Sequence, residues 1–207
     1  MKFNRRQTGF TLIEVLLVVI IMAIITTGAF SGMLNLQRTS RVNAINRQFS
    51  NFLELARSYS LNGKLVNSGC DNGKTECVPK SFSVITQKND PKCTTSPNNR
   101  SVRLIYQKAT ASGFNPNDIV TMDSFCVNPK IEYWYVGPNN AGEKFADDIP
   151  FSYTPPFGTF AVDDQISSAP QKITLTFCET ATDTKKCTLQ NTYTKAITLY
   201  TNVGVLE

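Results

Sequence analysis

The feature that most constrains this chain is an apolar run at residues 12–34, which is long enough to cross the hydrocarbon core of a bilayer. Glu14 is the only ionisable residue in the run, and Lys2, Arg5 and Arg6 precede it. Basic residues on one flank of a spanning helix keep that flank in the cytoplasm. We therefore expect a single-pass membrane protein with a cytoplasmic N-terminus and an exported remainder.

Glu14 needs a partner or a task, because a carboxylate in hydrocarbon costs about 2.5–3.5 kcal/mol on insertion scales. A cut after Gly9 would leave a new ammonium group on Phe10, four residues before Glu14. Within one helix these charges would lie about one turn apart. Between neighbouring helices, the ammonium of one chain would neutralise the carboxylate of the next.

These residues resemble the class III signal of type IV pilins and type II secretion pseudopilins. A short basic leader ending in Gly9, the aromatic Phe10, Glu14 and the apolar run fall in the same register as in that signal. The resemblance implies cleavage between Gly9 and Phe10 by the prepilin peptidase, N-methylation of Phe10, and a role for Glu14 in assembly. It also implies docking with other pilin or pseudopilin subunits on an inner-membrane platform. An ordinary secretory signal would carry its cleavage site after the apolar run.

A second apolar stripe predicts that the helix continues beyond the membrane, because apolar side chains recur every three or four residues. The stripe consists of Val42, Ile45, Phe49, Phe52, Leu53, Ala56 and Tyr59. We expect this face to pack against a sheet. Asn62 and Gly63 are typical of a helix end.

Beyond Gly63 the sequence changes to short apolar runs separated by Asn, Gly, Pro and Asp. Several runs alternate with a period of two, which predicts strands. The expected strands are residues 82–87, 102–108, 131–136, 158–162, 173–178 and 196–201. No segment of helical periodicity follows Ser60, so the fold class is α+β, with a long N-terminal helix packed on a mainly antiparallel, pilin-like β-sheet head.

We therefore expect four parts in the chain: a leader at 1–9, a transmembrane or filament-core helix at 10–34, an amphipathic helix at 35–62, and a β-rich head at 63–207. About 145 residues suffice for one domain with a sizeable core. The formal net charge is +5, and three of the positive side chains lie in the leader. The charge by itself therefore does not predict a nucleic-acid partner.

The cysteines all lie in the part expected to be exported: Cys70, Cys77, Cys93, Cys126, Cys178 and Cys187. An even count in an oxidising compartment predicts disulfides, and six cysteines allow 15 pairings. Cys70–Cys77 and Cys178–Cys187 would each close a short loop, which leaves Cys93–Cys126, but the connectivity stays open at this point. The absence of histidine and of Cys-x-x-Cys spacing argues against zinc.

The sequence predicts a structural protein rather than an enzyme. The chain has no histidine, the commonest general base, and it shows no glycine-rich phosphate loop and no metal cluster. We therefore expect no catalytic residue, no cofactor and no bound metal. The pairs Asp147-Asp148 and Asp163-Asp164 offer oxygen ligands for calcium, but they lack the spacing of a calcium loop.

A looser resemblance narrows the family. Residues 151–158 before a strand, the ending at 201–205, and Ala56-Arg57-Ser58 are similar to the minor-pilin group that contains GspH and FimT/FimU. The resemblance implies a minor pilin or pseudopilin, in some cases at the filament tip. The N-terminal machinery is common to type IV pili, type II secretion pseudopili and competence filaments, so all three stay open here.

Two alternative functions concern the head. Some FimT-like minor pilins bind DNA for uptake through a C-terminal Gly-Arg-x-Arg segment, but the matching stretch here, Gly204-Val205-Leu206-Glu207, has no arginine. Lys172, Lys185 and Lys186 are too sparse for a phosphate-binding stripe. The aromatic run Tyr133-Trp134-Tyr135 would alternate between the faces of one strand, in packing and in subunit contact, with an adhesive tip as the alternative.

Overall fold

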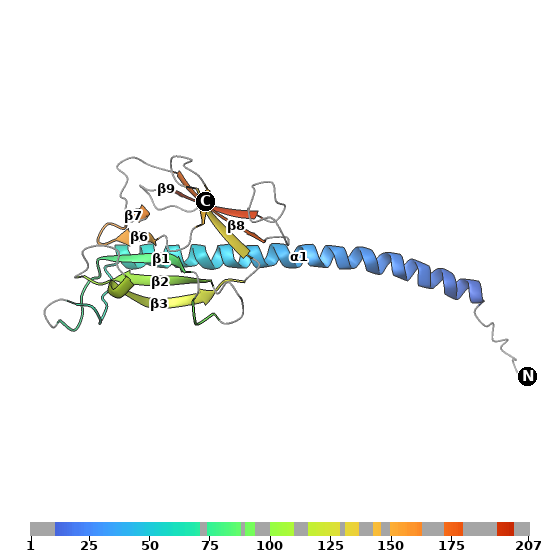
Figure 1. The fold of residues 1–207 in the computed structure, drawn as a ribbon, viewed down its shortest axis with the longest axis horizontal. Helices are drawn as coiled ribbons and strands as arrows, with labels where there is room; N and C mark the ends of the chain where they lie inside the picture. The colour runs from blue at the N-terminus through green and yellow to red at the C-terminus, as the bar shows by residue number, and fades with distance from the viewer. Residues whose placement is uncertain are drawn as a thin grey trace, which may run out of the picture. The chain divides into compact units, whose positions relative to one another are not determined.

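A computed structural model describes residues 11–70, 74–87, 90–93, 100–109, 116–128, 131–136, 143–145, 150–162, 172–179 and 194–200. The chain divides into two compact units, Met1–Ser40 and Arg41–Glu207. Helix α1 (Leu12–Leu61) begins in the first unit and ends in the second (Figure 1).

The first unit is helical from Leu12 onward. The carbonyl of Thr11 accepts hydrogen bonds from the amides of Glu14 (3.1 Å) and Val15 (3.3 Å), which close the first turn. Farther along, the hydroxyl of Thr26 donates to the Met22 carbonyl at 2.8 Å. Thr27 bonds in the same way to a carbonyl of the preceding turn. A polar group in hydrocarbon must be satisfied internally, and these hydroxyls meet that requirement within the helix itself.

The described residues of the second unit contain two antiparallel sheets. The first sheet has the strand order β3-β2-β1-β6-β7, and the second has the order β5-β4-β8-β9. The strands of the first are β1 (Ser81–Gln87), β2 (Ser101–Gln107), β3 (Ile119–Cys126), β6 (Pro150–Thr154) and β7 (Thr159–Val162), with the 3-10 helix η2 (Pro116–Asp118) before β3. Those of the second are β4 (Ile131–Val136), β5 (Glu143–Phe145), β8 (Lys172–Glu179) and β9 (Thr194–Tyr200).

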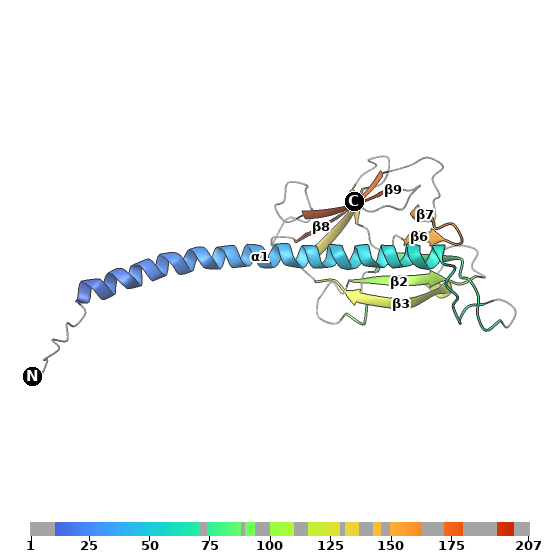
Figure 2. The same cartoon turned by 180° about the vertical axis from the view of Figure 1, so that it is seen from behind.

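The C-terminal half of α1 packs against both sheets. In both views, β2 and β3 run along one side of this half and β8 and β9 along the other (Figures 1 and 2). Phe49 contacts both layers, with ring centroids 5.7 Å from Phe151 of β6 and 5.5 Å from Phe177 of β8. Phe52 packs on Phe125 of β3 at 5.3 Å. One helix therefore supplies the core of both sheets.

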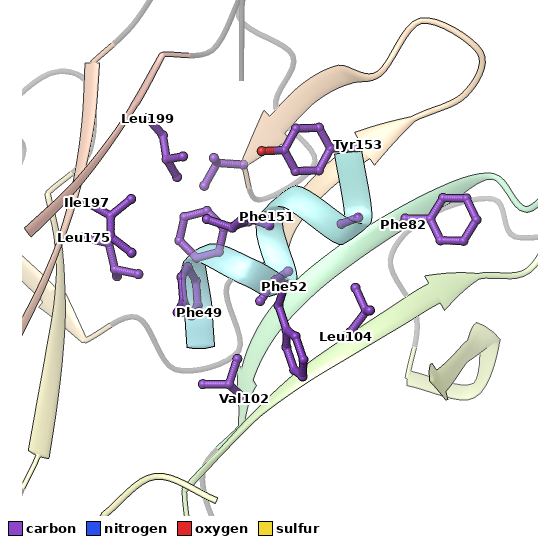
Figure 3. Packing of buried hydrophobic residues seen from close by; sticks show 14 of the residues in the cluster. Phe49, Phe52, Phe82, Val102, Leu104, Phe151, Tyr153, Leu175, Ile197 and Leu199 are labelled. Atoms are coloured by element: carbon purple, nitrogen blue, oxygen red, sulfur yellow. The ribbon is translucent and has the colours of Figure 1, made fainter. Parts of the chain in front are cut away.

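The predicted helical stripe is the buried face of α1. Its residues from Val42 to Ala56 are at most 8% exposed, and Tyr59 is partly buried against the same core. Figure 3 shows Phe49 on the side of Leu175 and Ile197, and Phe52 extending toward Val102. The period of three and four residues thus identified the packing face correctly.

The predicted helix end is also confirmed. Gly63 adopts a left-handed conformation with φ of 58°. The amide of Lys64 donates to the Tyr59 carbonyl at 3.0 Å and the amide of Asn62 to the Ser58 carbonyl at 3.0 Å. These bonds satisfy carbonyls that the helix leaves free at its end, and glycine takes the required backbone conformation without steric cost.

The α+β class and antiparallel pairing are confirmed, and the six expected strands correspond to β1, β2, β4, β7, β8 and β9, with ends that differ by at most two residues. The pattern missed β3, β5 and β6. Strand β3 lies at a sheet edge, and its alternation is interrupted: Thr121 and Asp123 are exposed, but Ser124 and Phe125 are consecutive half-buried positions. Strand β6 begins at Pro150, a residue that favours a loop but is tolerated at the first position of a strand. Strand β5 has three residues, too few for a pattern.

Replacing Phe49 by alanine should lower the free energy of unfolding of the head by about 3–5 kcal/mol, because the cavity would open between both sheets. Urea unfolding of the detergent-solubilised chain, followed by the fluorescence of Trp134, would measure the loss. Leu55→Ala is the matched control, because Leu55 is 39% exposed on the same helix and its truncation should cost about 0.5 kcal/mol. Equal losses in the two variants would contradict the proposed packing.

Candidate functional site

Glu14 lies in the first turn of α1, where unpaired amides and the helix dipole favour a negative charge. Its side chain is exposed. So are the apolar side chains around it, since every Leu, Ile, Val, Met and Phe described from Leu12 to Leu36 is at least 47% exposed. By its length and composition, α1 qualifies as a membrane-spanning helix. The first half of α1 therefore exposes one carboxylate, that of Glu14, on a predominantly apolar helix surface.

Several predicted residues lie outside the described part of the chain. Gly9 and Phe10 are among them, as are Lys2, Arg5 and Arg6 of the leader. The structure thus places Glu14 on α1 but does not describe its position relative to Phe10.

The head contains two disulfides among its described pairs. Cys70 is bonded to Cys77, with 5.6 Å between the Cα atoms, and Cys93 is bonded to Cys126, with 5.5 Å between them. Cys178 is also disulfide-bonded. Cys187 lies outside the described residues, so the pairing Cys178–Cys187 stays a prediction.

A buried carboxylate lies three residues before Cys93 of the second disulfide. Asp90 is fully buried. One oxygen, Oδ2, accepts hydrogen bonds from the Ser101 hydroxyl (2.5 Å) and from Nε of Arg103 (3.0 Å), and it lies 2.7 Å from Nη2 of the same arginine. The other oxygen, Oδ1, accepts the amide of Lys92 at 3.0 Å. We call Asp90, Ser101 and Arg103 the Asp90 cluster.

Burial by itself would raise the pKa of Asp90. The hydrogen bonds from Ser101, the Lys92 amide and Arg103, together with the Arg103 charge, outweigh burial and hold this pKa at about 2. The carboxylate is therefore charged, paired and fully hydrogen-bonded at neutral pH, which is the arrangement of a structural anchor.

Sequence reasoning missed the Asp90 cluster. Ser101 and Arg103 are two apart on β2 and share one face of it, which the period of two indicates. Asp90 lies outside any strand, in the connection between β1 and β2. No local pattern places a loop aspartate on a strand face.

The remaining candidates do not form a site in the described residues. Asp147, Asp148, Asp163 and Asp164 lie outside the described part, as do Lys185, Lys186 and residues 204–207. Where the chain is described, no group of three or more His, Cys, Asp or Glu residues is placed to hold a metal ion. Lys172 lies at the start of β8, and the Tyr133-Trp134-Tyr135 run lies on β4, where Tyr133 is opposite Phe177 of β8.

Residues 4–30 match the family described as the prokaryotic N-terminal methylation motif. No curated protein and no solved structure matched the chain. The match covers residues 4–9 of the leader, with Arg5, Arg6 and Gly9, and it continues through Phe10 and Glu14 into most of the apolar run. It supports a type IV pilin-like protein of the pilin and pseudopilin superfamily that the prepilin peptidase cleaves and that assembles with other pilins. Together with the apolar α1, it fits a membrane-anchored pilin.

The lowered pKa of Asp90 predicts a pH dependence of head stability. Because the pKa falls from 3.8 to about 2 on folding, the carboxylate stabilises the head above about pH 4, and this contribution is lost as the pH falls through 2. At pH 7, Asp90→Asn should lower the free energy of unfolding by roughly 1–2 kcal/mol. Urea unfolding at a series of pH values should show the two curves converging near pH 2. A difference independent of pH would contradict the assignment.

Proposed function

We propose that this chain is a minor pilin or pseudopilin that the prepilin peptidase cleaves between Gly9 and Phe10, and that Phe10 is then N-methylated. The mature subunit is built into a type IV pilus or a type II secretion pseudopilus. One observation carries the proposal: the methylation motif at residues 4–30 runs directly into a helix whose apolar side chains are exposed.

The exposed apolar side chains explain why such a subunit needs either lipid or neighbours. Each Å² of apolar surface moved into water costs roughly 25 cal/mol. A subunit that leaves the bilayer must therefore have its helix covered by other helices as it leaves. We infer that residues 10–34 are the membrane helix before assembly and the filament core afterwards, with the leader at 1–9 removed. Residues 35–62 carry the helix into the head at 63–207.

Glu14 can determine how neighbouring helices align when the subunit moves from lipid into the filament. In lipid its charge is costly, and a compensating positive charge lowers that cost. Cleavage after Gly9 creates such a charge on Phe10, and methylation of an amine retains it. In our proposal the ammonium of one subunit neutralises Glu14 of its neighbour, so the pair favours one axial register among helices that are otherwise uniformly apolar.

The proposed orientation has the N-terminus in the cytoplasm and the head exported to the periplasm or cell surface. Lys2, Arg5 and Arg6 before the apolar run support it. The two disulfides of the head support it independently, because such bonds persist in oxidising compartments.

We further propose membership of the GspH and FimT/FimU group and a place at the filament tip. Ala56-Arg57-Ser58 lies in the last turns of α1, and the turn at 155–158 leads into β7, in agreement with the sequence resemblance.

Gly9→Val should leave the leader attached, because a branched side chain at the cut position obstructs the peptidase. Intact-mass measurement of the membrane-inserted protein should then show Met1 retained and no methyl group on Phe10. Gln7→Val is the control, since it changes the leader away from the cut and should be processed normally. A mature, methylated product from Gly9→Val would refute the proposed cleavage site.

Glu14→Leu should permit insertion and cleavage but reduce incorporation into filaments by about tenfold or more, because the ammonium on Phe10 would have no partner. Quantification of the subunit in sheared filaments and in membranes would separate the two steps. Val15→Leu, a conservative apolar change beside it, should assemble normally. Undiminished incorporation of Glu14→Leu would mean that the carboxylate serves another purpose.

A further inference from the structure

Two separate attachments hold one short segment of the head. Residues 90–93 carry Asp90 at one end, inside the Asp90 cluster, and Cys93 at the other end, in the disulfide with Cys126. The amide of Cys93 donates to the Asp90 carbonyl at 3.0 Å, so the segment is closed on itself. Fixing the carboxylate of Asp90 therefore also fixes the position of Cys93.

The Asp90 hydrogen bonds and the Cys93–Cys126 disulfide both connect the segment to the same place on the first sheet, where the start of β2 pairs with the end of β3. Ser101 of β2 donates its hydroxyl to Asp90, and Ser101 is directly opposite Cys126 in the β2–β3 ladder. The amide of Val127 donates to the Arg100 carbonyl at 2.9 Å, which continues this pairing past the end of β3. The hydrogen bonds of Asp90 thus hold the segment next to Ser101 on β2, and Cys126 is the residue paired with Ser101 on β3.

We propose that Asp90 is a positioning residue for the Cys93–Cys126 disulfide: it holds Cys93 against β2, beside Cys126, before the bond forms and after it is broken. Among the residues between the two cysteines, Ser101 and Arg103 provide the side-chain anchors. This inference concerns the head alone and does not rest on the proposed function.

The physical basis is loop closure. Cys93 and Cys126 are 33 residues apart, and bringing such distant residues together costs conformational entropy. A segment already held by a buried, charged hydrogen-bond cluster has lost part of that entropy, so the two sulfurs meet at a raised effective concentration. Because coupling is reciprocal, the disulfide must stabilise the cluster by the same factor by which the cluster stabilises the disulfide.

The chemistry is thiol–disulfide exchange with glutathione as the co-reactant. In reduction, a glutathione thiolate attacks Cys126 Sγ, whose residue is exposed, and releases the thiolate of the buried Cys93. A second glutathione thiolate attacks the glutathione sulfur of the mixed disulfide, releases Cys126 as a thiolate and leaves oxidised glutathione. Formation runs in reverse, with oxidised glutathione taking both electrons. The cluster acts by keeping the released Cys93 thiolate beside its partner.

The test uses the full chain in detergent, equilibrated with mixtures of reduced and oxidised glutathione, quenched with acid, alkylated and analysed by peptide mass. In Asp90→Asn, the equilibrium constant for reduction of Cys93–Cys126 should rise about fivefold to thirtyfold, which is the stability loss expected for this variant expressed as a ratio of equilibrium constants. Ser101→Ala removes one of these hydrogen bonds and leaves those from Arg103 and the Lys92 amide, so it should give a smaller rise than Asp90→Asn. It serves as the test variant if Asp90→Asn fails to fold.

Cys70–Cys77 is an internal control in the same chain, and its equilibrium constant should stay unchanged in both variants. Asp123→Asn is the control for charge: Asp123 is exposed on β3, three residues before Cys126, and its carboxylate accepts the Ser124 amide at 2.7 Å. This variant should shift neither disulfide. An equal shift of both disulfides in Asp90→Asn would indicate a general loss of stability, and no shift of Cys93–Cys126 would show that the cluster does not position it. Either result would overturn the proposal.

Discussion

The apolar half of α1 is not buried by any other described part of its own unit. This exposed apolar surface is the constraint that the rest of the structure must satisfy. The described side chains from Leu12 to Leu36 would remain in contact with water if the chain were alone in solution. Lipid or the helices of neighbouring subunits are the two environments that remove this cost. In either environment the single carboxylate of Glu14 has a large energetic effect, because an unpaired charge in apolar surroundings is costly.

The head meets the opposite requirement, because it buries its apolar surface with the second half of the same helix. Phe49 contacts both sheets and Phe52 packs on β3, so the core of each layer is completed by α1. The head is further held by covalent and ionic links at the rim of the first sheet, where the Asp90 cluster and the Cys93–Cys126 disulfide fasten the segment between β1 and β2. These links act where β3 is an edge strand without a second neighbour among the described strands.

Local periodicity was sufficient for the buried face of α1 and for six of the nine described strands. The stripe from Val42 to Tyr59 was predicted residue by residue, because in a helix each step of three or four returns to the same side. Strand β3 was missed because its alternation is interrupted where Ser124 and Phe125 are consecutive half-buried positions. Strand β6 was missed because Pro150 carries a loop signal that sheet pairing with β1 and β7 overrides. The Asp90 cluster was missed because its members meet only after β2 and the preceding loop have folded together.

The sequence by itself determined the processing motif, the apolar helix with its lone acid, the extent of α1 and the α+β class, since each depends on residue order within a few turns of chain. The tertiary structure alone decided that the strands divide into two sheets that both pack on α1. It also decided that Asp90 is charged and buried against Arg103. The physical reason is that these features depend on contacts between residues distant in the chain, whose free energy comes from burial and from charge pairing that exists only once the head has formed.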